Sequence, residues 1–169
     1  MTSRSQLLQF PVMAVACLCA ASCAKLARCQ MDKVRADVLH YEEQCGPLAK
    51  QERELSGRID ELEGKIFTNQ KAGVDLLKAV LVRATHAYAD KLAAIQVRSD
   101  LLRPLHRKKV IAYKRLAQAY EQLMAAYPRA DFDAIRRGLK LRERAMRDRA
   151  AAELQLARLI RKYKRRRRK

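Results

Sequence analysis

Residues 31–66 read MDKVRADVLHYEEQCGPLAKQERELSGRIDELEGKI, and the apolar positions of this stretch decide the fold class. They recur in steps of four and three residues, with one step of seven where Glu52 takes the expected position. This spacing forms one stripe along an α-helix and is the heptad pattern of a coiled coil. The stripe predicts an oligomer seam, for contact with a second copy or a helical partner, made by Val34, Val38, Tyr41, Leu48, Leu55, Ile59, Leu62 and Ile66.

Glycines and prolines predict where the helices bend and end. Gly46–Pro47 interrupts the seam, so we expect a kink or a short break of the helix there, because proline removes a backbone donor from a helix. The polar run 68–73 is predicted to close the first helix and to open a helical hairpin. Further apolar stripes are predicted to end or bend at Pro104 and to stop at Pro128.

The last helix is predicted to start at an N-cap, Asp131, which can bond a free amide of the first turn. From Leu139 onward, half of the expected seam positions carry charged side chains. We therefore expect this helix to project from the body and to be steadied by surface ion pairs.

The composition agrees with a helical chain. The 169 residues include only five glycines, four prolines and no tryptophan, and no stretch alternates apolar and polar residues over a sustained run. This excludes a turn-rich all-β fold. We predict an all-α protein, an elongated coiled coil or helical hairpin of three to four long helices with an apolar targeting helix at the N-terminus.

An uncharged segment of eighteen residues, 7–24, precedes the seam. It reads LLQFPVMAVACLCAASCA and follows Arg4, which is the order of a signal peptide. Its end, Leu18-Cys19-Ala20-Ala21-Ser22-Cys23, resembles the lipobox of bacterial lipoprotein precursors, with Ala20 where that family usually has leucine. The resemblance implies that the thiol of Cys23 is lipidated and that Cys23 becomes the first residue of the mature chain.

Other interpretations of the leader stay open. Four cations follow the apolar run closely, Lys25, Arg28, Lys33 and Arg35, and such a cluster favours a cytoplasmic position for that side of the segment. An uncleaved signal anchor is therefore one alternative. The first acidic residue is Asp32, so an organellar presequence is another. A buried helix with no targeting role is the last.

The cysteines do not indicate a disulfide framework or a metal site. All five lie within the first 45 residues, and the spacing C-x-C-x3-C-x5-C of the first four is not that of structural zinc sites. If Cys23 is acylated, Cys29 and Cys45 remain as a candidate pair, although Cys45 also fits a seam position. We predict no cofactor and no metal.

The charge is polarised along the chain, which carries a formal net charge of +19. After a leader at 1–23, we expect a mildly acidic coiled-coil arm at 24–68, a basic helical hairpin region at 69–129 and a highly basic helix and arm at 130–169. Residues 32–68 carry −3, residues 69–129 carry +8 and residues 130–169 carry +11. The anion-binding arm is predicted to consist of Arg161, Lys162, Lys164, Arg165, Arg166, Arg167, Arg168 and Lys169.

Nothing in the sequence indicates catalysis. His40, His86 and His106 stand alone, no glycine-rich phosphate loop occurs, and no serine lies in a nucleophile elbow. We expect a non-enzymatic, exported or membrane-associated coiled-coil protein whose basic half binds an anionic membrane or envelope polymer. One alternative is a protein that binds nucleic acid or assembles ribonucleoproteins behind a presequence. Another is a signal-anchored coiled coil that bridges a membrane to a partner, resembling the phage spanins in outline.

Overall fold

The computed structural model describes the backbone of residues 10–165 and the side chains of residues 29–65 and 69–164. In this part of the chain every regular element is a helix, which confirms the all-α class. The chain forms two units, Met1–Ala36 and Asp37–Lys169. The first unit contains the beginning of helix α1, and the other helices belong to the second unit.

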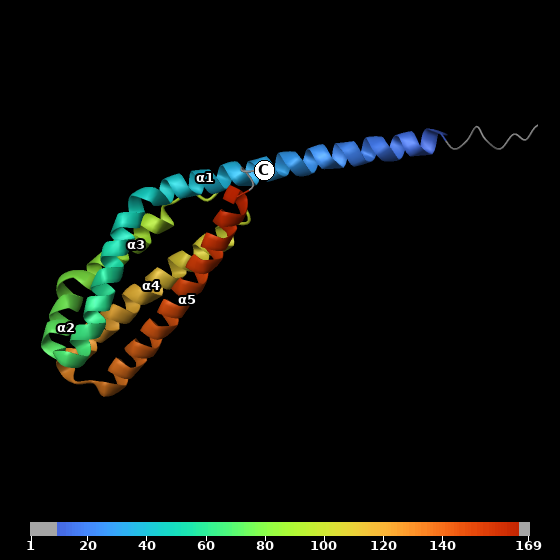
Figure 1. The fold of residues 1–169 in the computed structure, drawn as a ribbon. Coiled ribbons are helices and arrows are strands. Elements are labelled where there is room, and N and C mark those ends of the chain that lie inside the picture. The colour runs from blue at the N-terminus through green and yellow to red at the C-terminus, as the bar shows by residue number, and fades with distance from the viewer. Residues whose placement is uncertain (1–9, 166–169) are drawn as a thin grey trace, which may run out of the picture. The chain divides into compact units, whose positions relative to one another are not determined.

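Helix α1 (Phe10–Thr68) continues through Pro47, where we expected a kink or a short break. Pro47 lies inside the helix, and the ribbon of α1 changes direction in its cyan-to-teal stretch, which includes this residue (Figure 1). A proline removes one hydrogen bond of the ladder while the neighbouring bonds persist. The result is a bent helix and not a break.

The predicted hairpin turn lies at Asn69, whose side-chain oxygen accepts a hydrogen bond from the Ala72 amide at 3.1 Å. From there α2 (Gln70–Leu76), a π-helical turn (Leu77–Leu81) and α3 (Val82–Ala93) follow one another without a gap. The π turn holds one more residue than an α turn. Core positions therefore advance in steps of four from Leu77 through Leu81 to Thr85, which is fully buried.

Helix α4 (Arg103–Ala126) corrects the expectation at Pro104. The preceding helix already ends at Ala93, and Pro104 lies in the first turn of α4, where its missing N–H has no helical partner to lose. Pro128 does stop α4, because a 3₁₀ turn (Tyr127–Arg129) follows it. The N-cap is confirmed, since the Asp131 carboxylate accepts a hydrogen bond from the Ala134 amide at 2.9 Å.

Helix α5 (Phe132–Arg165) does not project from the body, contrary to our expectation. It runs beside α4, as Figure 1 shows, and Ala145, Ala152 and Leu156 are buried. At Gly138 the backbone lies so close to α4 that a Cβ would be 2.9 Å from Leu123 Cδ2. The seam of α5 therefore uses a small residue every seventh position, at 138, 145 and 152.

The core of the second unit is formed by one apolar cluster, which α1, α3, α4 and α5 all contribute to. Leu55, Ile59 and Leu62 belong to it, and Leu48 packs against it. Val38 and Tyr41 are buried and Val34 is half-buried, whereas the side chain of Ile66 lies outside the described residues. The seam thus contacts the chain's own helices, and an oligomer formed through it stays a prediction.

Candidate functional site

Ion pairs hold the acidic arm of α1 against the basic helix α5. Glu42 pairs with Lys164 at 2.7 Å, and Glu63 pairs with Arg142. As the position on α1 advances from 42 to 63, its partner on α5 retreats from 164 to 142, so the two segments run antiparallel. The charge polarity of the sequence is therefore partly neutralised within the chain.

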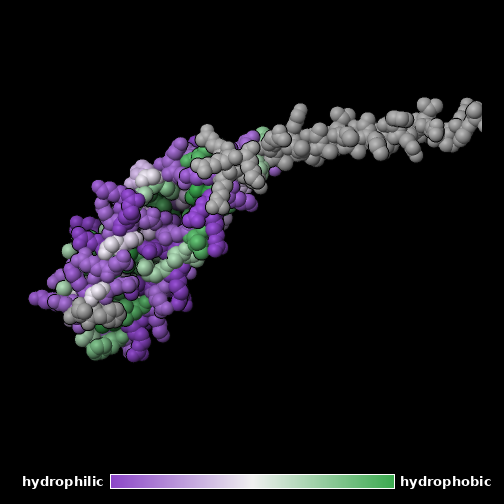
Figure 2. Space-filling view, in the orientation of Figure 1, coloured by the Kyte–Doolittle hydropathy of each residue, from purple (hydrophilic) through white to green (hydrophobic). Residues whose placement is uncertain are grey.

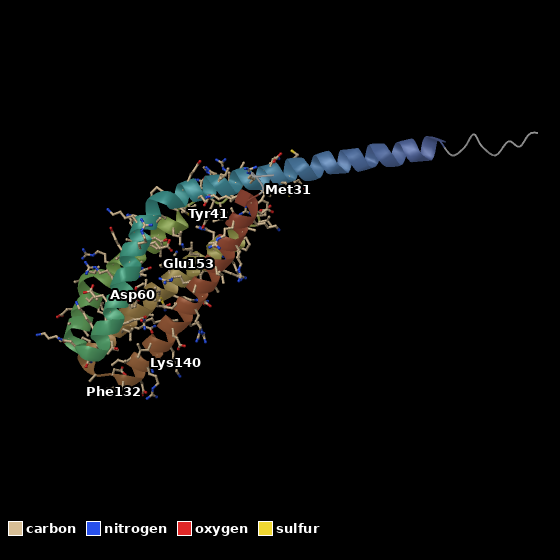
Figure 3. All side chains as sticks on the ribbon, in the orientation of Figure 1. Met31, Tyr41, Asp60, Phe132, Lys140 and Glu153 are labelled. Atoms are coloured by element: carbon tan, nitrogen blue, oxygen red, sulfur yellow. The ribbon has the colours of Figure 1, made fainter. Side chains whose placement is uncertain are left out.

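Between these two pairs lies a mixed cluster of acid and base. The ammonium of Lys109 on α4 lies 2.6 Å from a carboxylate oxygen of Glu52 and 3.8 Å from one of Glu153. The Tyr113 hydroxyl donates to Glu52 at 2.9 Å and approaches Glu153 at 3.3 Å. Arg149 adds a second cation, 3.8 Å from Glu153. Figure 3 labels Glu153 within the helical body.

The two carboxyl groups have opposite pKa shifts. Burial alone would raise the pKa of Glu52, but the Lys109 ammonium and the hydrogen bonds to Glu52 outweigh burial and lower it. Burial raises the pKa of Glu153, and the neighbouring Glu52 carboxylate raises it further against the opposing effect of Lys109 and Arg149. Glu52 is thus the ionised partner of Lys109, whereas Glu153 holds a proton more readily.

A buried tyrosine–histidine contact lies at the start of α4, one turn before Lys109. His106 is only 7% exposed. Burial and the nearby Lys109 lower its pKa, and burial raises the pKa of Tyr41. The neutral ring therefore accepts a hydrogen bond from the Tyr41 hydroxyl at Nδ1, over 3.1 Å. The contact fastens α1 to α4.

The outer side of α5 carries cations along its length. Between residues 140 and 162, the exposed ones that lie on one helical face are Lys140, Arg144, Arg147, Arg158, Arg161 and Lys162, which we call the cationic stripe. Glu143 bonds Arg147 at 2.6 Å, and no described carboxylate pairs with the other five. At 1.5 Å per residue the stripe is about 33 Å long. Lys140 is labelled in Figure 3.

The predicted arm is only partly described. Arg161 and Lys162 are exposed, and Lys164 forms the pair with Glu42. The side chain of Arg165 and all of Arg166, Arg167, Arg168 and Lys169 lie outside the described residues. The predicted lipidation site, Cys23, is on α1, but its side chain is likewise outside them. Cys29 and Cys45 are free thiols, so the candidate pair is not formed.

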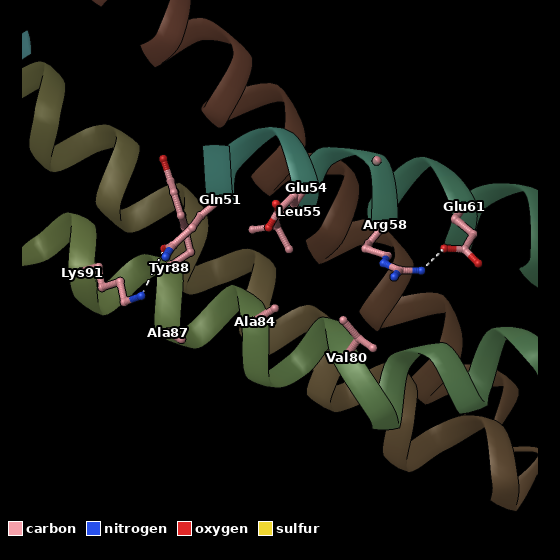
Figure 4. A pocket seen from close by; sticks show the side chains of 11 residues that line it. Gln51, Glu54, Leu55, Arg58, Glu61, Val80, Ala84, Ala87, Tyr88 and Lys91 are labelled. Carbon is pink, nitrogen blue, oxygen red and sulfur yellow. Dashed lines mark hydrogen bonds and ion pairs between the residues drawn. The ribbon is translucent and has the colours of Figure 1, made fainter. Parts of the chain in front are cut away.

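A groove of about 680 Å³ lies between α1 and α3. Leu55, Val80 and Tyr88 are among its apolar lining residues (Figure 4), and a hydrogen bond of 3.2 Å from Lys91 to Gln51 crosses between the two helices. No cluster of three or more histidine, cysteine or carboxylate side chains suited to a metal occurs in the part of the chain that the structure describes. The groove between α1 and α3 thus has a concave, partly apolar surface, but its described residues include no set of metal ligands.

Sequence reasoning found the cations of α5 but missed the buried cluster beneath them. Glu52 was read as a gap in the seam, yet it is the residue around which Lys109 and Tyr113 gather. A charged residue at a heptad core position was the available signal. Its partners come from α4 and α5, 57 and 101 residues further along the chain, and no local pattern connects them.

Comparison with known proteins gives no assignment: no protein-family model, curated protein or solved structure matches the chain. Among the described residues, none of the helices has a stretch long and apolar enough to cross a membrane. The function must therefore be argued from the surface itself.

Proposed function

We propose that this chain is a non-enzymatic helical interaction protein that binds an anionic component of a cell envelope through its basic C-terminal half. The observation that carries the proposal is the cationic stripe of α5, five of whose six members pair with no described carboxylate. The arm continues this charge to the end of the sequence, because residues 165–169 are all basic.

The packing of α5 supports this role. The small seam at Gly138, Ala145 and Ala152 lets one side of α5 lie close to α4, while the opposite side stays in solvent. Figure 2 shows that hydrophilic residues cover most of the visible face of the helical body. A long, exposed and nearly acid-free row of cations is suited to a surface of many phosphates, each cation contributing about 1 kcal/mol near an anionic membrane.

In this proposal, the apolar N-terminal segment directs the chain to the cell envelope. The apolar segment that precedes Cys23 acts as an export signal, and acylation at Cys23 tethers the mature chain to a membrane. Intact mass of the protein from its native host, measured alongside cell fractionation, tests this step. We expect a chain that begins at Cys23 with added acyl mass in the envelope fraction. A soluble chain that retains Met1 would contradict it.

Vesicle sedimentation tests the binding activity. The full chain is mixed with vesicles of phosphatidylcholine alone or of phosphatidylcholine with phosphatidylglycerol, over a series of salt concentrations. We expect binding only to the anionic vesicles, with release as salt screens the cations. Duplex RNA is the competitor. Displacement by RNA at far lower phosphate concentration than the lipid would instead support the nucleic-acid alternative.

A further inference from the structure

Two hollows of similar size lie between α4 and α5. The first, of about 330 Å³, is lined by seven residues: Lys108, Ile111, Arg115, Asp148, Ala151, Ala152 and Gln155. The second, also of about 330 Å³, is lined by Gln122, Ala125, Ala126, Arg129, Asp131, Ala134 and Arg137. Both lie outside the cationic stripe, whose members line neither hollow.

The two hollows belong to one side of the helix pair. On α4 the lining positions 108, 111, 115, 122 and 125 are spaced by three, four and seven residues, which keeps them on a single face, and Arg129 follows in the 3₁₀ turn. On α5 the lining positions 134, 137, 148, 151 and 155 are spaced by three, four and eleven residues, which also keeps them on one side of the helix. The two hollows therefore open on the same side of the helix pair, and together we call them the α4/α5 groove, which extends for about 32 Å from residue 108 to residue 129 at about 1.5 Å per residue.

The chemistry of this groove is amphipathic. Its inner surface consists of small or apolar side chains, and Ile111 is 37% exposed in the first hollow. Four cations line it: Lys108, Arg115, Arg129 and Arg137. Asp148 pairs with Arg115 at 2.9 Å and Asp131 caps α5, so Lys108, Arg129 and Arg137 are the lining cations that no described carboxylate pairs with. The groove thus presents apolar contact area between basic edges.

We propose that the α4/α5 groove docks an acidic amphipathic helix of a partner protein. A helix that lies in a groove between two others places apolar anchors at heptad spacing against the inner surface and its charged residues against the edges. Basic edges select glutamate and aspartate on those flanks. A phosphate backbone would use the cations but would leave Ile111 and the alanines without apolar contacts, and a second copy of this strongly basic chain would be repelled.

The spacing of the hollows sets the spacing of the anchors. Ile111 in the first hollow and Ala125 in the second are fourteen residues apart on α4, about 21 Å. The docked helix therefore carries apolar anchors about four turns apart. This interaction goes beyond the proposed function, because its ligand is a protein helix and it depends on apolar contact as well as charge.

The probe is a fluorescein-labelled synthetic helix of about six turns with leucine at heptad positions and glutamate on the flanks. The control probe has the same composition with the leucines scrambled. Binding to the full chain is measured by fluorescence anisotropy. We expect the patterned peptide to bind at least about tenfold more tightly than the scrambled one, a difference of about 1.4 kcal/mol. Equal affinities would overturn the proposal.

Two groove variants and one matched control locate the contact. Ala125→Glu and Ala151→Glu place a carboxylate in each hollow at exposed positions that the fold tolerates. Ala150→Glu makes the same charge change on α5 at an exposed position outside the groove. We expect each groove variant to weaken peptide binding at least about tenfold and the control to weaken it less than about threefold. Equal weakening in all three would overturn groove docking and would indicate charge attraction alone.

Discussion

At the scale of single residues, two positions explain how the helices contact one another. Gly138 permits the close approach of α5 to α4, and Glu52 organises the buried cluster with Lys109 and Tyr113. In both cases an unusual residue at a core position marks a contact between helices distant in sequence. Each leads to a substitution with a matched control.

Gly138→Ala tests the close approach. The new Cβ would lie 2.9 Å from Cδ2 of Leu123, which is fully buried and cannot move aside without disturbing the core. Overpacking outweighs the gain in helix propensity, so we expect the free energy of unfolding in urea to fall by about 1 kcal/mol. Gly57 is the control, because nothing lies within 4 Å of the position of its Cβ. Gly57→Ala should stabilise by about 0.5–1 kcal/mol. Equal stabilisation by both would contradict the contact.

Glu52→Gln and Glu153→Gln test the opposite pKa shifts. A lowered pKa in the folded state means that the Glu52 contribution to stability is present above the unfolded pKa and is lost as pH falls. A raised pKa at Glu153 means a contribution present at low pH and lost as pH rises. At neutral pH, Glu52→Gln should therefore lower the free energy of unfolding by about 2 kcal/mol, because it leaves Lys109 without its closest partner. Glu153→Gln should lower it by less than about 1 kcal/mol.

Urea unfolding over a pH series provides the measurement. Above a pH of about 4.3, the usual pKa of glutamate, the Glu153→Gln variant should lose less stability with rising pH than the unaltered chain. If the two variants cost the same at every pH, the assignment of the ionised and the proton-holding carboxyl would be wrong.

At the scale of elements, the π-helical turn at Leu77–Leu81 is the feature with the clearest consequence. It holds one extra residue, so deletion of exposed Ala79 should convert it to a regular α turn while both flanks keep their faces toward the core. We expect a loss in the free energy of unfolding of less than about 1 kcal/mol. Deletion of Ala87, exposed in the regular helix α3, is the control.

The control deletion should be severe. Removing Ala87 rotates the rest of α3 by about 100°, which turns Leu92 away from the core. We expect loss of the cooperative unfolding transition monitored by circular dichroism. If the two deletions are equally damaging, the extra residue in the π turn is not the reason for the four-residue spacing of the core.

Local patterns predicted much at this scale. Heptad spacing located the buried stripe of α1, the polar run at 68–73 located the turn, and Asp131 was identified as an N-cap. Two elements were misjudged for physical reasons. A heptad search that favours large apolar residues overlooks Gly138, Ala145 and Ala152, whose value is close backbone approach. Pro104 was read as an end because the sequence does not tell a first-turn proline from a terminating one.

At the scale of the whole chain, the net charge of +19 is distributed between internal ion pairs and the exposed surface. Part of it is matched internally, since Glu42, Glu52 and Glu63 of α1 pair with cations of α4 and α5. These pairings join residues that are 57 to 122 positions apart, which is why the sequence alone indicated a protein-facing acidic arm instead. The remaining charge lies on the stripe and continues into the arm.

The most direct test of the central claim is anionic-vesicle binding by two matched double variants of the full chain. Lys140→Gln with Arg144→Gln removes two cations of the stripe, and Lys78→Gln with Arg83→Gln removes two exposed cations elsewhere. At about 1 kcal/mol for each cation, the stripe variant should bind phosphatidylglycerol vesicles roughly thirtyfold more weakly than the unaltered chain, and the control less than about threefold. Equal losses in both variants, or no binding by the unaltered chain at low salt, would contradict the account.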